Sequence, residues 1–308
     1  MGHDDYQLSK IARLYYDDGM TLKRIGERMN VSIATVSRSL VEARRRGIVE
    51  ITIRDEMGDF RDLESTIERK FGLAECRIVR SSDRSEDVYR EMATALSGML
   101  SRTLRPGMLV GLSWGQTLKS VGEYLPALQR ARCDTIPILG AIGAVETGLF
   151  PNAISRSFAD RLGGKSYLVN APAILDTKSI RETIEAESTF RPIKLRWEEL
   201  DVVLLSVSGL DRKASVSHYQ ILERAAIDEL VQAGAICATN FIMLDGEGHE
   251  VRSELTNRLL RLTLPELLNV KRRVILSFGK SKVAAVRAAL RGGIATTLVT
   301  DRDTAAGI

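Results

Sequence analysis

The first part of the chain alternates apolar and polar residues with a helical period. The spacing predicts three helices, over residues 6–18, 22–29 and 33–46, each with apolar side chains three or four positions apart. Thr21 and Ser32 stand where helix N-caps are expected, and a glycine follows the first and the third helix. This part of the chain therefore predicts a small helical unit.

The next residues change character twice. Residues 48–53 (IVEITI) alternate apolar with polar positions, which predicts a strand and would complete a winged-helix-like unit. Residues 55–72 are rich in charge and predict a helix with an apolar stripe of Phe60, Leu63 and Ile67. We interpret them as a linker helix that could also contact another subunit; that they form the first helix of a larger domain stays equally open.

From residue 74 onward, strand-like and helix-like runs alternate. Strands are expected at 76–79, 109–112, 135–139, 166–169, 202–207, 235–244, 273–278 and 295–300. Helices are expected at about 86–103, 116–126, 153–162, 178–190, 216–233, 255–267 and 281–291. Apolar strands that alternate with helices predict an α/β domain whose sheet is mostly parallel and covered on both faces.

Length and composition agree with two domains. The 308 residues are 44% hydrophobic and 27% charged, which is typical of a globular protein. We expect a helix-turn-helix domain at 1–54, the linker helix at 55–72, and a larger α/β domain at 73–308. Three scattered cysteines, no signal peptide and no long apolar run predict a cytoplasmic protein without disulfides or a membrane segment.

The third helix carries the side chains expected to read DNA. A helix-turn-helix places one face of its second helix in the major groove, so its outward residues contact bases and phosphates. Val36 and Leu40 should face inward. The residues expected to contact DNA are Ser32, Thr35, Ser37, Arg38, Arg44 and Arg45. Residues 10–54 hold ten Lys and Arg against five Asp and Glu, which favours a polyanionic partner; a solvated helical subdomain that binds only proteins is the alternative.

A second signal follows the strand at 109–112. Residues 113–117 (SWGQT) turn from the strand into a helix, and a Gly-containing turn at a helix N-terminus exposes N–H groups that suit an anion. The turn lacks the P-loop and Rossmann glycine patterns, so no nucleotide cofactor is expected. A plain structural turn is the alternative.

Residues 21–53 resemble the DNA-binding head of the SorC/DeoR-type sugar-binding transcriptional regulators. The shared string is Thr35-Val36-Ser37-Arg38, Leu40, Ala43-Arg44, Gly47-Ile48-Val49, Ile51 and Ile53. The resemblance continues over almost the whole chain. It implies that residues 73–308 form an effector-binding and oligomerisation domain like the sugar-phosphate isomerase and deaminase fold. It also implies an effector such as a phosphorylated sugar or polyol, and a tetramer.

The resemblance also implies where the effector binds. The family's effector loop corresponds to Ser113, Trp114, Gly115, Gln116 and Thr117, and a family lysine corresponds to Lys282. Other residues expected at the site are Ser206, Ser208 and Asn240. Lys280 could substitute for its neighbour, and Asp301 could cap or orient a loop. Near the position where the family commonly carries an acidic residue, this chain has Cys237 and Ala238. Either Asn240 partly replaces that contact, or the effector differs from a simple sugar phosphate.

These features together predict a DNA-binding transcriptional regulator that a small effector controls. Its expected partners are double-stranded operator DNA, the effector and further copies of itself, as a dimer or tetramer. We expect no catalytic residue, no metal and no cofactor, because the three histidines are isolated and no nucleophile motif is present. The alternatives are an isomerase- or deaminase-like enzyme, or an adaptor that binds only proteins.

Overall fold

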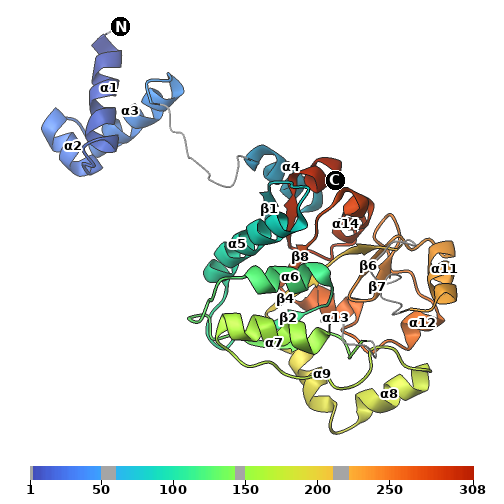
Figure 1. Cartoon of the computed structure of the whole chain (residues 1–308). Coiled ribbons are helices and arrows are strands. Elements are labelled where there is room, and N and C mark those ends of the chain that lie inside the picture. Colours follow the sequence, from blue (N-terminus) through green and yellow to red (C-terminus); the bar gives the residue numbers. More distant parts are fainter. Residues whose placement is uncertain (1–2, 50–59, 143–149, 211–221) are drawn as a thin grey trace. The chain divides into compact units, whose positions relative to one another are not determined.

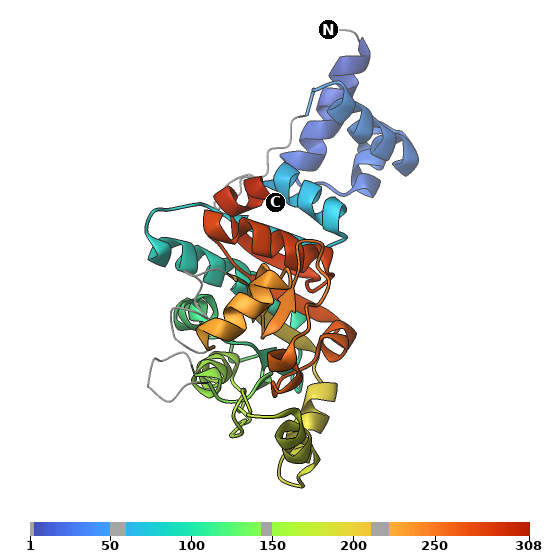
Figure 2. The same ribbon diagram turned by 90° about the vertical axis from the view of Figure 1, so that its right-hand side faces the viewer.

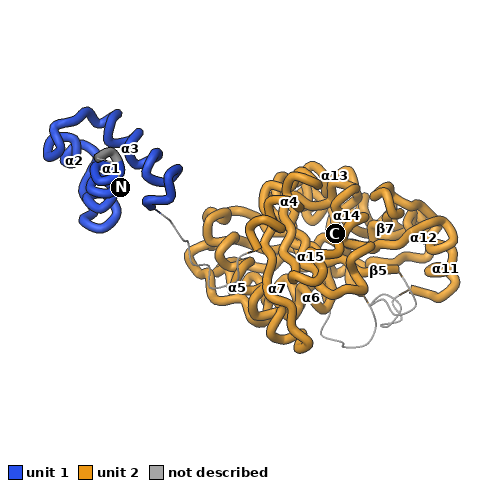
Figure 3. Tube along the Cα trace, turned by 90° about the horizontal axis from the view of Figure 1, so that it is seen from above, with its two compact units in different colours: residues 1–56 blue, residues 57–308 orange. Residues whose placement is uncertain are grey.

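The computed structural model describes residues 3–49, 60–142, 150–210 and 222–308. The chain divides into two compact units, Met1–Glu56 and Met57–Ile308, which Figure 3 colours separately. Each unit buries an apolar core of its own. The fold of each unit therefore follows from its own segment of the sequence.

The smaller unit contains three helices among its described residues. They are α1 (His3–Tyr16), α2 (Leu22–Met29) and α3 (Ile33–Arg45) (Figure 1). Both expected N-caps form: Thr21 Oγ1 accepts a hydrogen bond from the N–H of Arg24 (3.4 Å), and Ser32 Oγ accepts one from the N–H of Thr35 (3.1 Å). Between α2 and α3, Asn30 adopts a left-handed conformation (φ 54°), which makes the turn tight.

Helix α2 lies close to this turn because position 26 has no side chain. A Cβ on Gly26 would stand 2.8 Å from the backbone oxygen of Val31, closer than real contacts allow. Ile25, Val36 and Leu40 are buried on the inner side of α2 and α3, as their spacing predicts. The helix-turn-helix geometry therefore depends on one glycine as well as on the apolar face.

The strand expected at 48–53 is wrong where the structure describes it. The N–H groups of Ile48 and Val49 both bond the carbonyl of Ala43, at 2.9 and 3.2 Å, and close the last turn of α3. Gly47, with φ 70°, lets the chain fold back in this way. Both side chains pack against the core of the smaller unit instead of pairing in a sheet. Residues 50–53 lie outside the described residues.

The larger unit is built on a parallel sheet, which confirms the predicted α/β class. Its strands are β1 (Glu75–Val79), β2 (Leu109–Leu112), β3 (Asp134–Pro137), β4 (Val202–Ser206), β8 (Arg272–Leu276) and β9 (Thr297–Asp301). Their order is β1-β9-β8-β4-β2-β3, and every neighbouring pair is parallel. From β2 the chain moves to one side, to β3, and from β4 it moves to the other, to β8. The carboxyl ends of β2 and β4 therefore form a topological switch point, where ligands bind in open α/β sheets.

The described part of the larger unit also contains helices. They are α4 (Arg61–Phe71), α5 (Ser85–Thr103), α6 (Gln116–Tyr124), α7 (Pro151–Leu162), α8 (Lys178–Ala186), α9 (Arg191–Glu198), α11 (Arg224–Gln232), α12 (Glu254–Asn257), α13 (Leu264–Asn269), the 3₁₀ turn η1 (Lys280–Lys282), α14 (Val283–Arg291) and α15 (Arg302–Gly307). In Figure 2, α5, α6 and α7 (teal to light green) form a row on one side of the larger unit, and the orange and red C-terminal segments lie on the other.

The apolar run at 235–244 is two strands, not the single strand that we expected. It forms β6 (Cys237–Thr239) and β7 (Ile242–Leu244), which join β5 (Ser208–Gly209) in a small antiparallel sheet. Asn240 and Phe241 form the hairpin turn, both with positive φ (48° and 56°). The sequence did not predict this turn, because both strands are buried and a continuous apolar run gives no sign that the chain reverses direction.

Two other expected elements differ from the structure, and a third lies partly outside the described residues. The helix expected at 255–267 is interrupted, because the segment between α12 and α13 pairs with other strand ends through the bridges Leu139–Arg261 and Ile174–Leu259. The strand expected at 166–169 is reduced to one bridge, Thr135–Ser166, and α9 was not expected at all. The N-terminal part of the helix expected at 216–233, up to residue 221, lies outside the described residues.

The described part of the interval 55–72 packs with the larger unit. Ile67 of α4 is buried in that unit's core, and Phe60, Leu63 and Phe71 pack against it. Helix α4 also contacts β1 and α15. Of the two interpretations of this interval, the first helix of the larger domain fits this packing; residues 55–59 lie outside the described residues.

Candidate functional sites

The outer face of α3 presents polar side chains to solvent. Ser37 and Arg38 are exposed, and Val36 and Leu40 are buried beneath them. Ser32 Oγ lies 2.8 Å from the hydroxyl of Thr35, so these two side chains interact with each other while Ser32 caps the helix. Four of the expected DNA contacts therefore lie in the first two turns of one helix, the part that enters a major groove in helix-turn-helix proteins.

Helix α3 also exposes two apolar side chains that we did not expect. Ile33 is 52% exposed and Val41 is 55% exposed, and both belong to α3. Exposed aliphatic groups on a recognition helix can contact the methyl group of thymine. Periodicity alone could not find them, because apolar residues are normally assigned to the core.

The arginines at the end of α3 differ in their surroundings. Arg45 bonds Glu42 through two nitrogens, at 2.6 and 2.7 Å, and Arg46 bonds both Glu42 and Asp5. Hydrogen bonds from Arg45 and Arg46 lower the pKa of Glu42 to about 2. Arg44 is exposed and makes no ion pair with another described residue. It is thus the arginine of this group whose charge is most available to a phosphate.

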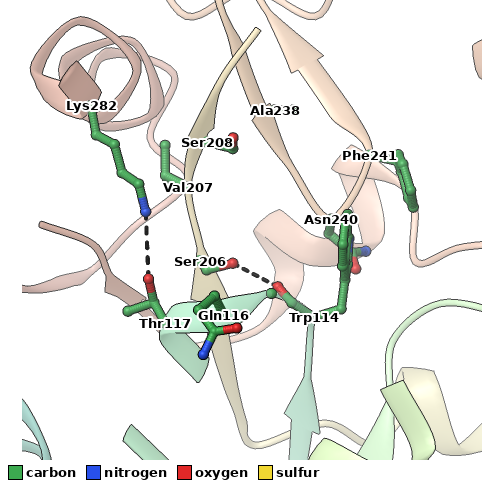
Figure 4. A pocket seen from close by; sticks show the side chains of 11 residues that line it. Trp114, Gln116, Thr117, Ser206, Val207, Ser208, Ala238, Asn240, Phe241 and Lys282 are labelled. Atoms are coloured by element: carbon green, nitrogen blue, oxygen red, sulfur yellow. Dashed lines mark hydrogen bonds between the residues drawn. The ribbon is translucent and has the colours of Figure 1, made fainter. Parts of the chain in front are cut away.

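A pocket opens in the larger unit at the carboxyl ends of β2 and β4. It encloses about 460 Å³, part of it open to solvent. Of the nine residues expected to bind the effector, eight line it: Trp114, Gly115, Gln116, Thr117, Ser206, Ser208, Asn240 and Lys282 (Figure 4). Segments that lie between positions 114 and 282 of the sequence thus converge on one site. Val207, Ala238 and Phe241 complete its described lining and were not expected there.

The turn between β2 and α6 forms the floor of this pocket. Gly115 precedes α6 with φ 124°, and no side chain caps the helix. The hydroxyl of Ser206 donates to the carbonyl of Trp114 at 2.6 Å and holds the turn against β4. A Cβ on Gly115 would lie 2.7 Å from Ser206 Oγ, so this approach requires glycine. The first N–H groups of α6 have no partner within the helix and can receive an anion.

Lys282 adds a positive charge above this helix N-terminus. It comes from η1, and its Nζ lies 3.5 Å from the hydroxyl of Thr117 (Figure 4). No Asp or Glu occurs among the described residues that line the pocket. Burial lowers the pKa of Lys282 below its usual value, because the protonated form lacks a compensating charge. The pocket therefore combines a helix N-terminus with a lysine that has no carboxylate partner in the described lining.

An aromatic pair and an asparagine form the opposite wall. The rings of Trp114 and Phe241 stack, with centroids 5.4 Å apart and planes 21° from parallel. Asn240 Nδ2 donates to the carbonyl of Ile138 at 3.2 Å, and its Oδ1 accepts from Ser113 Oγ at 3.2 Å. Ser113 is fully buried and does not line the pocket. Ser113 was expected to contact the effector directly. In the structure it instead positions Asn240, whose Oδ1 accepts its hydrogen bond.

The other two C-terminal candidates lie outside the lining. Lys280 forms an ion pair with Asp303 at 3.1 Å, and its side chain is 80% exposed. Asp301 is buried; it caps α15 by accepting from the N–H of Thr304, and it accepts from the hydroxyl of Ser81 at 2.6 Å. Asp301 therefore stabilises the segment after β9 and does not line the pocket.

The cysteines and potential metal ligands among the described residues form no catalytic or metal site. Cys76, Cys133 and Cys237 are buried, and burial raises the pKa of Cys133 to about 11 and that of Cys237 to about 12. Within the described ranges, His, Cys, Asp and Glu form no cluster of three that could hold a metal ion. None of the described helices combines the length and apolar character needed to span a bilayer.

Comparison with known proteins places both units. Residues 55–308 match the sugar-binding domain family, and residues 9–46 match the family of sigma-70 region 4. The chain is 31% identical to the sorbitol operon regulator of Klebsiella pneumoniae over 98% of this chain and 97% of that protein. It is 25% identical to the deoxyribonucleoside regulator of Bacillus subtilis (strain 168) over 99% of this chain and 98% of that protein.

Solved structures of transcriptional regulators have a similar fold. The full-length sorbitol operon regulator SorC from Klebsiella pneumoniae superposes with a TM-score of 0.74 at 29% identity, covering 99% of each chain. A DeoR family transcriptional regulator from Listeria monocytogenes superposes on 80% of this chain and 98% of its own, with a TM-score of 0.73 at 24% identity. These relatives are regulators of transcription and not enzymes, so the enzymatic alternative is set aside.

A helix-turn-helix unit joined to a sugar-binding domain defines a DNA-binding regulator of transcription. This chain belongs to the SorC/DeoR-type family of sugar-binding transcriptional regulators, which confirms the resemblance seen in its sequence.

Proposed function

We propose that this regulator binds operator DNA through the outer face of α3, and that a phosphorylated sugar or polyol in the pocket of Lys282 controls that binding. The surface of the protein that contacts DNA consists of Ser32, Thr35, Ser37, Arg38, Arg44 and Arg45. The effector's anionic group binds the N-terminus of α6 and Lys282, and its hydroxyls face Ser206, Ser208 and Asn240. Ligand and operator then change each other's affinity by the same factor, as linkage requires.

One observation carries the choice of an anionic effector. The amine of Lys282, which is positively charged when protonated, lies beside a helix N-terminus in a pocket whose described lining holds no carboxylate. A neutral ligand would leave that charge uncompensated, whereas a phosphate would satisfy both the lysine and the open N–H groups of α6. The relatives named for sorbitol and for deoxyribonucleosides direct the search to small polyols and sugars.

The apolar wall limits how such an effector can be held. Cys237 and Ala238 stand near the place where the family commonly carries an acidic residue, and Ala238 lines the pocket. Trp114 and Phe241 continue the same wall with a stacked apolar surface. Hydroxyl groups must therefore be recognised by Asn240 and the serines, which favours a ligand with an apolar edge on this side.

The effector class can be tested by thermal unfolding of the purified full chain. The panel should contain sorbitol, deoxyribose and related sugars, each with and without a phosphate group. We expect one phosphorylated member to raise the unfolding temperature by several degrees, because a ligand that binds only the folded state stabilises it. A shift with unphosphorylated members alone would contradict the anionic part of the proposal.

Arg38 is expected to read a base and not only a phosphate. Arg38→Ala should weaken specific operator binding by ~1–3 kcal/mol while non-specific DNA binding changes little. Fluorescence anisotropy with operator and scrambled duplexes measures both affinities. Arg13→Ala, which removes one exposed charge from α1, is the control. An equal loss on both duplexes would reduce Arg38 to a phosphate contact.

A single recognition helix per chain also implies that at least two copies act together. Two half-sites one helical turn apart require a dimer, and we propose a dimer or tetramer that acts on DNA in the cytoplasm. Light scattering of the full chain measures the mass. A strictly monomeric protein that still binds its operator tightly would contradict this part.

A further inference from the structure

Residues of α8, α12 and the start of α13 line a second cavity of the larger unit. It encloses about 680 Å³, part of it open to solvent, and shares no lining residue with the pocket of Lys282. Three arginines line it, Arg181, Arg252 and Arg261, together with one carboxylate, Glu250. The sequence separates the first of these arginines from the others by some seventy residues, so only the fold brings them together.

Arg261 is the innermost of the three. Its side chain is 6% exposed, and the bridge to Leu139 fixes its backbone at the end of the main sheet. One terminal nitrogen donates to the carbonyl of Leu262 and the other to Glu250, both at 3.1 Å. Its Nε is buried and has no hydrogen-bond partner among the described residues. Burial lowers the pKa of Arg261, because Glu250 only partly compensates a guanidinium taken out of water.

Arg181 reaches the same cavity from α8. Its Nε is also buried and without a partner in the described part of the chain. Its terminal nitrogens lie 3.4 Å from Glu185 and 3.5 Å from Glu182, long distances for charged hydrogen bonds. Two of the four unpartnered buried polar side-chain atoms in the described residues thus belong to arginines of one cavity.

The remaining carboxylates nearby are already engaged. Glu250 uses one oxygen for Arg261 and the other for Arg252, at 3.1 Å each. Glu266 accepts from both the N–H and the hydroxyl of Thr263 and pairs with Lys194 at 2.9 Å. The described lining therefore carries more positive than negative charge, and two of its arginines each keep an Nε–H group without a partner among the described residues.

We propose that this cavity is a second anion-binding site, which takes a phosphate-sized oxyanion, either free phosphate or the phosphate group of a small metabolite. An oxyanion between Arg181 and Arg261 would accept hydrogen bonds from planar guanidinium groups, which bind phosphate with two parallel bonds. The oxyanion would also add negative charge, because Glu250 alone does not compensate the three arginines. Arg252, whose side chain is 74% exposed, closes the solvent side.

Calorimetric titration of the full chain with inorganic phosphate at constant ionic strength tests this assignment. The Lys282→Met variant is used as background, so that phosphate in the first pocket does not contribute. We expect saturable binding in this background, and about tenfold weaker binding (~1.4 kcal/mol) when Arg252→Gln or Arg181→Gln is added. Arg156→Gln, which removes an exposed ion-paired charge from α7, should leave the affinity unchanged.

Two results would overturn the proposal. One is the absence of saturable phosphate binding in the Lys282→Met background; the other is equal affinity in the Arg252→Gln, Arg181→Gln and Arg156→Gln variants. Arg252 is exposed, so its variant keeps the test informative even if a change at buried Arg261 or half-buried Arg181 disturbs folding. Because the background lacks the lysine of the first pocket, failure here and failure of the proposed effector site are separable.

Discussion

Replacing Lys282 with methionine should weaken binding of the phosphorylated effector by roughly 100-fold and leave operator binding without effector unchanged. The methionine keeps the length and apolar stem of the side chain but removes the charge that faces the N-terminus of α6. In the described lining, no other cation can replace it. Calorimetry with the effector and anisotropy with operator DNA measure the two affinities.

Lys280→Met is the matched control for this experiment. It lies two positions away, removes the same charge, and breaks only the exposed ion pair with Asp303. Its effector affinity should stay close to that of the unchanged protein. Equal losses in the two variants would mean that the general charge of η1, and not a built contact, attracts the anion.

The lowered pKa of Lys282 adds a pH dependence to the same prediction. Effector affinity should fall as pH rises through this pKa, and the fall should begin below the range of an ordinary lysine, because the protonated form binds the anion. Without effector the unfolded chain holds this proton more tightly, so folding stability should rise over the same interval. Lys282→Met should remove both trends.

Gly26→Val should lower operator affinity toward the non-specific level, ~1,000-fold or more. The added Cβ would stand 2.8 Å from the backbone oxygen of Val31, and backbone in a tight turn cannot move aside as a flexible side chain can. The turn and α3 must therefore shift, at a cost of roughly 1–3 kcal/mol in the stability of the smaller unit. Anisotropy with operator and effector calorimetry should show that only DNA binding is lost.

Gly19→Ala provides the comparison. Gly19 also belongs to the smaller unit and has φ 63°, but no atom lies within 4 Å of the place where a Cβ would stand. Its substitution tests backbone strain without a clash and should reduce operator affinity far less. If Gly26→Val binds operator as well as Gly19→Ala does, then α2 and the turn are not held as close as we describe.

The pattern of the sequence was sufficient wherever local signals agreed with tertiary packing. The helix at 22–29, with Thr21 as its cap, and the strand at 109–112 have the predicted bounds, because cap chemistry and apolar spacing act within a few residues. Eight of the nine expected effector residues line one pocket, since parallel strands end at the same edge of the sheet. The resemblance to a family supplied Lys282, which no local pattern distinguishes from other lysines.

The sequence by itself determined a helix-turn-helix unit, an α/β domain with its mostly parallel sheet, and the residue types that meet where β2 and β4 end. Only the tertiary structure decided that Ser113 lies behind Asn240, that Phe241 stacks on Trp114 at a hairpin turn, and that Arg181 meets Arg261 in a second cavity. Ser113 and Asn240 are 127 positions apart, as are Trp114 and Phe241, and Arg181 and Arg261 are 80 positions apart. Local periodicity reports which face of an element is buried, whereas the neighbour that buries it is set by the packing of the whole unit.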